Sequence, residues 1–356
     1  MAKDRVSFLR LSTQFENVGD ALINRGLVQN ILTHSSLVVD VSSAPSEFVE
    51  EVLAGTDKSK VHVVQKGGYA ALAKAALAKR AAGKECYFFL LPAGYTGEKN
   101  RKAAANYAAI TTLMRALRMA GVKLVHLGPS YGALGRRYAS LLRSRVRHLD
   151  MHLVRDEQSR KLLQSLDVRC DGIVPDMSFS FEHTFVPREV ASDIAFSFRT
   201  DRNSDADQAR TRLLIENVLG QRPESTSIRL VAQVRRDAAF MQQLARELSD
   251  TRRAPVAYLE PRTISSTFEA YEGVGEVFSN RLHALLMAAH VGAAPVAYVE
   301  PKADAKIVGM FQDLGLDRNL VTEHDSVIAS EFSTLDSLSI SRRRDLICEA
   351  FKRVYR

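Results

Sequence analysis

The residues best placed for chemistry form one short run, Ser279, Asn280, Arg281, Leu282 and His283, where an apolar strand pattern stops and an apolar helix pattern begins. An arginine and a histidine in the first turn of such a helix are hard to assign to packing. A guanidinium binds phosphate or carboxylate, and an imidazole with an ordinary pKa of about 6.5 can move a proton near neutral pH. A histidine at such a helix start is as often structural as functional, so it is the arginine beside it that marks this run as a candidate site.

Other polar residues follow strand patterns in the same way. The turn Asn17-Val-Gly19-Asp20 comes after the first apolar run. Gly19 allows the chain to turn sharply there, Asp20 can cap the next helix, and the free amides of that helix start can meet an anion. Arg199 ends the first strand pattern of the second half of the chain, and Lys302 follows a later one.

Two further turns carry chemistry-bearing residues. Arg155 and Asp156 end a strand pattern, and we expect Arg155 to project unpaired at the carboxyl edge of the sheet. The segment Gly128-Pro-Ser130-Tyr-Gly132 has the G-x-S-x-G spacing of a hydrolase nucleophile. Pro129 restricts the backbone beside a serine that would need strain, so we interpret this segment as a glycine-rich turn.

The elements that position these residues alternate along the chain. Strand patterns occur at 6–11, 61–64, 86–91, 123–127 and 151–154, and again at 193–198, 228–234, 255–259, 275–279 and 295–299, with helical patterns between them. This rhythm predicts an α/β fold of two doubly wound Rossmann-like domains facing a cleft. The predicted domains are residues 1–185 and 186–335, with a final helix, 336–356, that packs back on the first domain.

Composition excludes several classes of protein. The 356 residues are 46% hydrophobic and 25% charged, which excludes a wholly disordered chain, and no apolar run reaches the ~18 residues of a membrane span. The three cysteines form no C-x-x-C pair, so we expect a reducing, cytoplasmic setting and no metal site. The chain has no G-x-G-x-x-G and no Walker motif, which argues against dehydrogenases and P-loop enzymes.

The net charge of +8 comes from one stretch of the chain. Eleven basic residues and no acidic residue lie between Lys99 and Arg147, and the rest of the chain has 38 basic and 41 acidic residues. Residues 136–147 also alternate basic and apolar side chains, as an amphipathic helix on an anionic membrane would. A solvated helix face is the simpler alternative. The stretch carries no nucleic-acid-binding motif, so we do not expect nucleic acid as a partner.

Taken together, these motifs resemble the polysaccharide pyruvyl transferase family over about residues 17–316. The S-x-R-L-H-A start of the helix at Ser279–Ala284 is the most specific part. Between about 195 and 275 little beyond Arg199 matches. The other matching elements are the N-x-G-D turn (Asn17, Gly19, Asp20), the R-D-x-x-S element with a following Pro-Asp (Arg155, Asp156, Ser159, Pro175, Asp176), and the segment Gly292, Pro295, Tyr298 and Lys302.

The resemblance implies transfer of the enolpyruvyl group of phosphoenolpyruvate onto two hydroxyls of one sugar, which forms a pyruvate ketal and releases phosphate. It also implies a fold like that of the GT-B glycosyltransferases and an acceptor in an exopolysaccharide or cell-surface glycan precursor. Phosphoenolpyruvate is the donor substrate, and no cofactor is implied. The implied catalytic residues are His283 as proton donor or relay, Arg155 in the anion clamp and Asp20 as base; the implied substrate-binding residues are Asn17, Gly19, Arg281, Arg199, Ser279 and Lys302.

Two other functions are compatible with the same residues. A nucleotide-sugar glycosyltransferase of the same fold would use an acidic residue, such as Glu300 or Glu323, on the ribose. A non-catalytic module that binds anions or membranes would need no His283. If the acceptor is lipid-linked, residues 99–147 would hold the protein peripherally on the inner face of the cell membrane.

Overall fold

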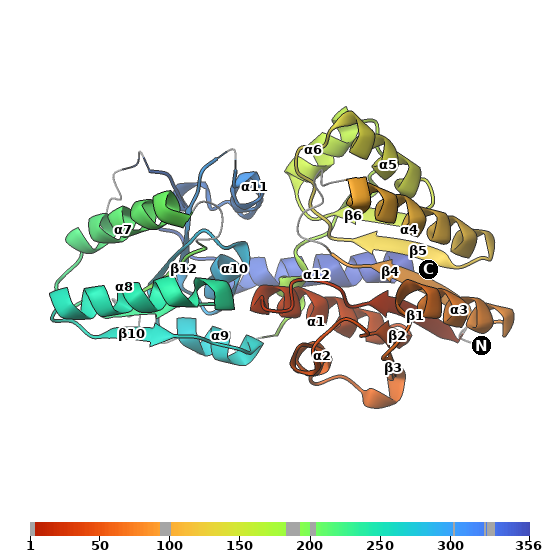
Figure 1. Ribbon diagram of the computed structural model, residues 1–356, viewed down its shortest axis with the longest axis horizontal. Coiled ribbons are helices and arrows are strands. Elements are labelled where there is room, and N and C mark those ends of the chain that lie inside the picture. Colours follow the sequence, from red (N-terminus) through yellow and green to blue (C-terminus); the bar gives the residue numbers. More distant parts are fainter. Residues whose placement is uncertain are drawn as a thin grey trace. The chain divides into compact units, whose positions relative to one another are not determined.

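The computed structural model describes residues 4–92, 101–182, 193–199, 204–301, 303–323, 325 and 332–356 (Figure 1). The chain forms two compact units. The first unit comprises Met1–Phe15, Asp20–Phe181 and Arg342–Arg356, and the second comprises Glu16–Gly19 and Glu182–Ser341. The boundary expected at residues 185 and 186 lies outside the described residues.

Within the described residues, the first unit contains a seven-stranded sheet in the order β3-β2-β1-β4-β5-β6-β7. Its strands pair in parallel, and the central ones are buried on both faces, as apolar runs such as Phe88-Phe89-Leu90 require. The strands are β1 (Arg5–Arg10), β2 (Ser36–Asp40), β3 (Val61–Val64), β4 (Glu85–Leu90), β5 (Lys123–Leu127), β6 (Met151–Val154) and β7 (Gly172–Ile173).

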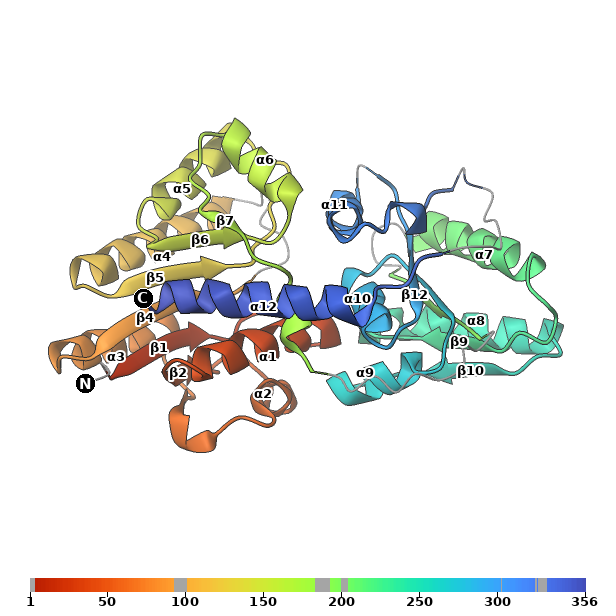
Figure 2. The ribbon, with the colours of Figure 1, turned by 180° about the vertical axis from the view of Figure 1, so that it is seen from behind.

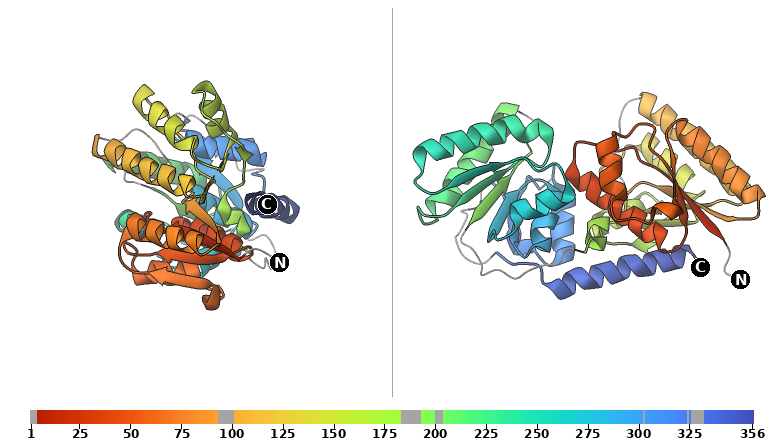
Figure 3. Two further views of the ribbon diagram at one scale, coloured as in Figure 1. Left: turned by 90° about the vertical axis from the view of Figure 1, so that its right-hand side faces the viewer. Right: turned by 90° about the horizontal axis from the view of Figure 1, so that it is seen from below.

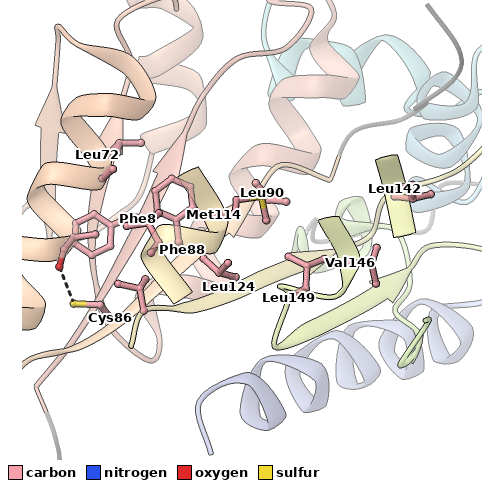
Figure 4. Packing of buried hydrophobic residues seen from close by; sticks show 14 of the residues in the cluster. Phe8, Leu72, Cys86, Phe88, Leu90, Met114, Leu124, Leu142, Val146 and Leu149 are labelled. Carbon is pink, nitrogen blue, oxygen red and sulfur yellow. Dashed lines mark hydrogen bonds between the residues drawn. The ribbon is translucent and has the colours of Figure 1, made fainter. Parts of the chain in front are cut away.

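One face of this sheet is covered by α3 (Gly68–Ala81), α4 (Arg101–Met119), α5 (Arg136–Val146) and α6 (Glu157–Ser165). Alternate strand residues point into this layer. Figure 4 shows Phe8, Phe88 and Leu124 of the sheet beside Leu72 and Met114 of the helices. Because every second strand residue faces these helices, the residues between them must be covered from the other side.

That other face carries the end of the chain. Helix α12 (Ser337–Val354) runs along the first unit's sheet, and the ring of Phe351 stacks on Phe89 with centroids 6.1 Å apart (Figures 2 and 3). The buried Tyr355 hydroxyl lies 2.7 Å from Ser7 Oγ and 3.1 Å from Ser35 Oγ. The remaining helices of the first unit are α1 (Val18–Leu32), which begins in the second unit's segment, and α2 (Ser46–Leu53).

The second unit repeats the same plan. In the part of the chain that the structure describes, its sheet has six parallel strands in the order β10-β9-β8-β11-β12-β13, which is the doubly wound order 3-2-1-4-5-6. The order reverses between β8 and β11, so the switch point of this sheet lies where these two strands end. The strands are β8 (Ile194–Ser197), β9 (Ile228–Val231), β10 (Val256–Leu259), β11 (Glu276–Ser279), β12 (Ala294–Tyr298) and β13 (Leu320–Val321).

Helices cover both sides of this second sheet. The cluster around Phe196, Leu230 and Phe278 packs against α7 (Ser204–Gly220) and α8 (Ala238–Thr251). The other helices are α9 (Ile264–Tyr271), α10 (Leu282–His290) and α11 (Ala305–Leu314). Most of α10 is buried on all sides, which explains the continuous apolar run that follows His283.

The predicted α/β fold with two doubly wound sheets is confirmed. The sequence prediction missed β2, α2 and the short strands β7 and β13. The two-residue strands β7 and β13 are too short to show a period, and they exist because β6 and β12 offer them a partner edge. None of the described helices combines the length and the apolar character that crossing a membrane requires.

Helix α5 corrects the interpretation of residues 136–147 as a lipid-facing helix. Its apolar side chains, Tyr138, Leu142 and Val146, are buried in the first unit's core. Arg145 is also turned inward, with its guanidinium over the Tyr107 ring and Nη2 donating to the Tyr107 carbonyl oxygen at 2.7 Å. The amphipathic pattern therefore reflects packing on the sheet, and this helix has no apolar face available to lipid.

We expect the Tyr355 hydroxyl to contribute measurably to stability. Tyr355→Phe removes its bonds to Ser7 and Ser35 and should lower the free energy of unfolding by about 1 kcal/mol, while Tyr355→Leu, which also removes the ring, should lower it by about 3–5 kcal/mol. Urea denaturation measures both values. Equal effects of the two substitutions would show that the ring does not anchor the C-terminal segment.

Candidate active site

The carboxyl ends of β8 and β11 are joined by side-chain hydrogen bonds. Ser279 Oγ donates to the Ser197 carbonyl oxygen and accepts the Arg281 N–H at 2.9 Å. The amide of Asn280 pairs with both backbone groups of Arg199, accepting its N–H at 2.6 Å and donating to its carbonyl oxygen at 3.0 Å. These bonds hold Arg199 and Arg281 next to each other at the switch point of the second unit's sheet.

The Arg281 side chain forms a buried ion pair with an acidic residue. Its Nη2 donates to Asp237 Oδ2, and the two side chains are only 9% and 2% exposed. Asp237 ends the short helix at Arg235–Asp237 that follows β9. The sequence did not predict this pairing, which offsets the cost of taking a charged guanidinium out of water.

Further positive charge surrounds this ion pair. Burial lowers the pKa of Arg281; Asp237 opposes that shift, and the nearby charges of Arg199 and Arg236 add to it. Arg199 is half-buried and Arg236 is exposed. A guanidinium keeps its proton despite such shifts, so all three arginines stay charged. Because guanidinium groups bind phosphate and carboxylate, this cluster makes the end of β11 the candidate anion site of the second unit.

His283 lies in the first turn of α10 and contacts the N-x-G-D turn. A side chain added at Gly19 would place its Cβ 2.4 Å from His283 Cβ and 2.5 Å from its Nδ1, so only a glycine fits there. Asn17 forms an antiparallel bridge with Val234 and accepts the Gly19 N–H at 3.1 Å through its own Oδ1. The turn thereby fixes the position of the His283 imidazole within the second unit.

Asp20 has a different position. It belongs to the first unit, where its Oδ2 accepts the Thr13 hydroxyl and, at 3.1 Å, the Gln14 N–H. These bonds shape the loop between β1 and α1. The structure thus shows Asp20 organising the turn, and its predicted role as a base stays a prediction.

Arg155 is the centre of a buried network in the first unit. Its Nη1 donates to Asp176 Oδ2 at 2.6 Å and its Nε donates to Ser130 Oγ at 3.1 Å, and the Arg155 and Asp176 side chains are 3% and 1% exposed. Ser130 in turn donates to Asp156 Oδ2 at 2.5 Å, and Asp156 caps α6 through the Ser159 N–H. This corrects the expectation that Arg155 is unpaired, since Asp176 neutralises it.

The same network decides against the hydrolase interpretation of Gly128–Gly132. Ser130 is fully buried, and its hydroxyl is bonded to Asp156 and Arg155. A nucleophilic serine needs a basic partner and an exposed oxygen. The network connects three loops at the carboxyl edge of the sheet, so its residues position these loops.

The structure brings six of the predicted site residues together in the second unit: Asn17, Gly19, Arg199, Ser279, Arg281 and His283. Arg155 and Asp20 belong to the first unit, and Lys302 lies outside the described residues. Sequence reasoning missed Asn280, Asp237 and Arg236. Asn280 stands inside the most specific motif, whereas nothing near Asp237 in the sequence signals its pairing with Arg281.

Among the described residues, no group of three or more His, Cys, Asp and Glu side chains could hold a metal ion. His290, seven residues after His283, packs edge-on against the Phe268 ring.

The Arg155–Asp176 pair should behave as one structural unit. Asp176→Ala leaves a buried, uncompensated guanidinium and should lower the free energy of unfolding by about 3–5 kcal/mol. The double variant Arg155→Met/Asp176→Ala removes both charges and should be more stable than Asp176→Ala alone. Urea denaturation of Arg155→Met, Asp176→Ala and the double variant gives the coupling energy. Strictly additive effects would contradict the pairing.

The comparisons with known proteins agree with this architecture. The UDP-GlcNAc 2-epimerase from Neisseria meningitidis bound to UDP-GlcNAc is 10% identical, with a TM-score of 0.52 over 99% of this chain and 93% of that chain. A putative UDP-N-acetylglucosamine 2-epimerase from Listeria monocytogenes is 11% identical, with a TM-score of 0.51 over 98% of this chain and 91% of that chain. At such low identity these likenesses show the GT-B-like two-domain α/β fold alone.

Sequence comparison is more specific. No curated protein matches this chain. The family model described as polysaccharide pyruvyl transferase matches residues 17–299, from the Asn17 turn to the end of β12, and so includes all the site residues described above. The chain therefore belongs to the polysaccharide pyruvyl transferase family.

Proposed function

We propose that this protein transfers the enolpyruvyl group of phosphoenolpyruvate onto two hydroxyls of one sugar and releases phosphate. The observation that supports this most strongly is the arrangement at the end of β11, where Arg199 and Arg281 lie side by side and His283 follows in the same helix turn. Family membership supports a transferase acting on a polysaccharide or its precursor.

The donor has two anionic groups, a phosphate and a carboxylate, and each suits a guanidinium. Asp237 holds the guanidinium of Arg281, while Ser279 and Asn280 fix the backbones of Arg281 and Arg199, from which the two side chains extend. Arg236 adds positive charge from the neighbouring strand end. Because the Arg281 guanidinium is fixed before the donor arrives, it loses little side-chain entropy on binding.

In the proposed reaction, His283 delivers or relays a proton to the methylene carbon of the donor, which leaves an oxocarbenium-like centre at C2. One sugar hydroxyl attacks C2, the C2–O bond to phosphate breaks, and the second hydroxyl closes the ketal. Of the two hydroxyl protons released, one balances the proton taken up by the methyl group and the other leaves with phosphate. The contact with Gly19 restricts the imidazole to one side of α10, which favours a defined direction of proton delivery.

We propose the acceptor by its chemical class. A sugar in an exopolysaccharide or cell-surface glycan precursor, free or linked to a lipid on the cytoplasmic leaflet, fits the family.

The alternative function, a nucleotide-sugar glycosyltransferase, requires Glu300 or Glu323 to bind the ribose. Glu323 pairs with Arg210 at 3.3 Å, and Glu300 is exposed. Neither carboxylate is therefore held in a position that favours binding of a nucleotide ribose.

Phosphate release tests the reaction and the role of His283. With phosphoenolpyruvate and a panel of pyranoside acceptors, His283→Ala should lower kcat by about 10²–10⁴-fold, as expected for loss of an acid–base group. The exposed His62 provides the matched control, and His62→Ala should be unchanged. If the protein instead consumes a UDP-sugar and leaves phosphoenolpyruvate intact, it is a glycosyltransferase. If His283→Ala keeps full turnover, the proposed role of His283 is wrong.

Donor binding tests the arginines separately. Arg199→Ala removes a charge-assisted contact and should weaken phosphoenolpyruvate binding by about 10–150-fold in calorimetry. Arg235 is exposed, as is its neighbour Arg236, and Arg235→Ala should change the Kd by less than about fivefold. Equal losses in the two variants would mean that overall positive charge, and not the Arg199 site, attracts the donor.

A further inference from the structure

A second concentration of positive charge lies in the first unit, near the amino ends of β6 and β7. A pocket of about 610 Å³ opens there between the ends of α5 and α6 and the segment that precedes β7. Arg143, Arg147, Arg160 and Arg169 line it, together with Asp167 and Asp171. The residues Ser130, Arg155 and Asp176 occupy the opposite, carboxyl edge of the same sheet, so the pocket is separate from that network.

Backbone carbonyls fix two of these arginines in place. Arg143 donates to the carbonyl oxygens of Leu166 and Asp167, at 2.5 and 3.1 Å, and Arg169 donates to that of Leu149 at 2.6 Å. Carbonyl oxygens orient a guanidinium without cancelling its charge, and each guanidinium has five N–H donors. Both arginines therefore keep spare donors at the pocket.

The carboxylates near the pocket compensate only part of this charge. Asp171 pairs with Arg169 at 3.2 Å and also accepts the His152 N–H, while Asp167 is fully exposed and 4.0 Å from Arg143. Arg160 pairs with Glu157 at the protein surface, where such pairs are weak. Arg147 is exposed on the rim of the pocket.

The positive surface continues from the pocket onto the end of α4. Arg118 donates to the Arg147 carbonyl oxygen at 2.7 Å, which places the end of α4 beside the rim. Arg115 and Arg118 also lie close to His148. The next residue after Arg118 is Met119, whose side chain is 80% exposed. An exposed apolar side chain beside arginines can enter the head-group layer of a bilayer while the arginines stay near the phosphates.

We propose that this edge of the first unit docks on an anionic lipid bilayer, with the arginine pocket binding a lipid head-group phosphate and Met119 entering the head-group layer. The pocket supplies guanidinium donors for a phosphate diester, and Arg115 and Arg147 add exposed charge beside it. Arg118 is shared between the Arg147 carbonyl oxygen and Asp150, which lies 3.9 Å from its Nη2. This docking does not require the transferase reaction. It uses the arginine pocket and Met119 as the membrane contact, and not the apolar face of α5, which is buried.

Vesicle sedimentation tests the proposal with a matched pair of double variants. Arg147→Gln/Arg160→Gln removes two pocket charges and should weaken binding to vesicles of equal parts phosphatidylcholine and phosphatidylglycerol by about thirtyfold, at about a fivefold loss for each arginine near the surface. Arg136→Gln/Arg137→Gln removes two exposed charges at the other end of α5 and should change binding by less than about threefold. Thermal unfolding confirms that both variants fold.

Three results would overturn the proposal. Equal losses in the two double variants would mean diffuse electrostatic attraction without a pocket. Release of the protein from the vesicles by inorganic phosphate at low millimolar concentration would make the pocket a site for free phosphate. Equal binding to pure phosphatidylcholine would exclude the charge mechanism. Because both variants should keep full phosphate release with a soluble acceptor, failure of the docking and failure of the transferase function are distinguishable.

Discussion

The ion pair between Arg281 and Asp237 sets the electrostatics of the second unit's switch point. Both side chains are almost fully buried, and charges withdrawn from water to this extent are maintained only when they pair. Asp237 orients Arg281, and the charges of Arg199 and Arg236 lie close enough to act on it. The result is a cluster of three guanidinium groups at this strand end, which suits the small substrate with two anionic groups that we propose.

A steric constraint complements this electrostatic one. Residues Glu16–Gly19 group with the second unit even though Asp20, the next residue, groups with the first. Gly19 lies so close to the His283 ring that no Cβ fits between them. The N-x-G-D turn and the S-x-R-L-H-A helix start, more than 250 residues apart in the sequence, therefore form one structural feature. The region that matches the family model, residues 17–299, includes both parts of this contact.

The periodic parts of the fold could be predicted from the sequence, and so could the grouping of polar residues at strand ends, because the strand ends of a parallel sheet meet at one edge. The partners of the arginines could not. Asp176 pairs with Arg155 and Asp237 pairs with Arg281 across loops that only the folded sheet brings together. The charge-rich stretch 99–147 was equally ambiguous, since Arg145 is buried over Tyr107, Arg143 caps α6 and Arg136 is exposed. Sequence alone gives all three the same weight.

A crystal structure of this protein with phosphoenolpyruvate tests the central claim most directly. The account predicts that the donor's phosphate and carboxylate lie within hydrogen-bond distance of Arg199 and Arg281, at the ends of β8 and β11, with the methylene carbon on the side of His283. A donor bound instead at the carboxyl edge of the first unit's sheet, or one that leaves Arg199 and Arg281 without contact, would contradict it.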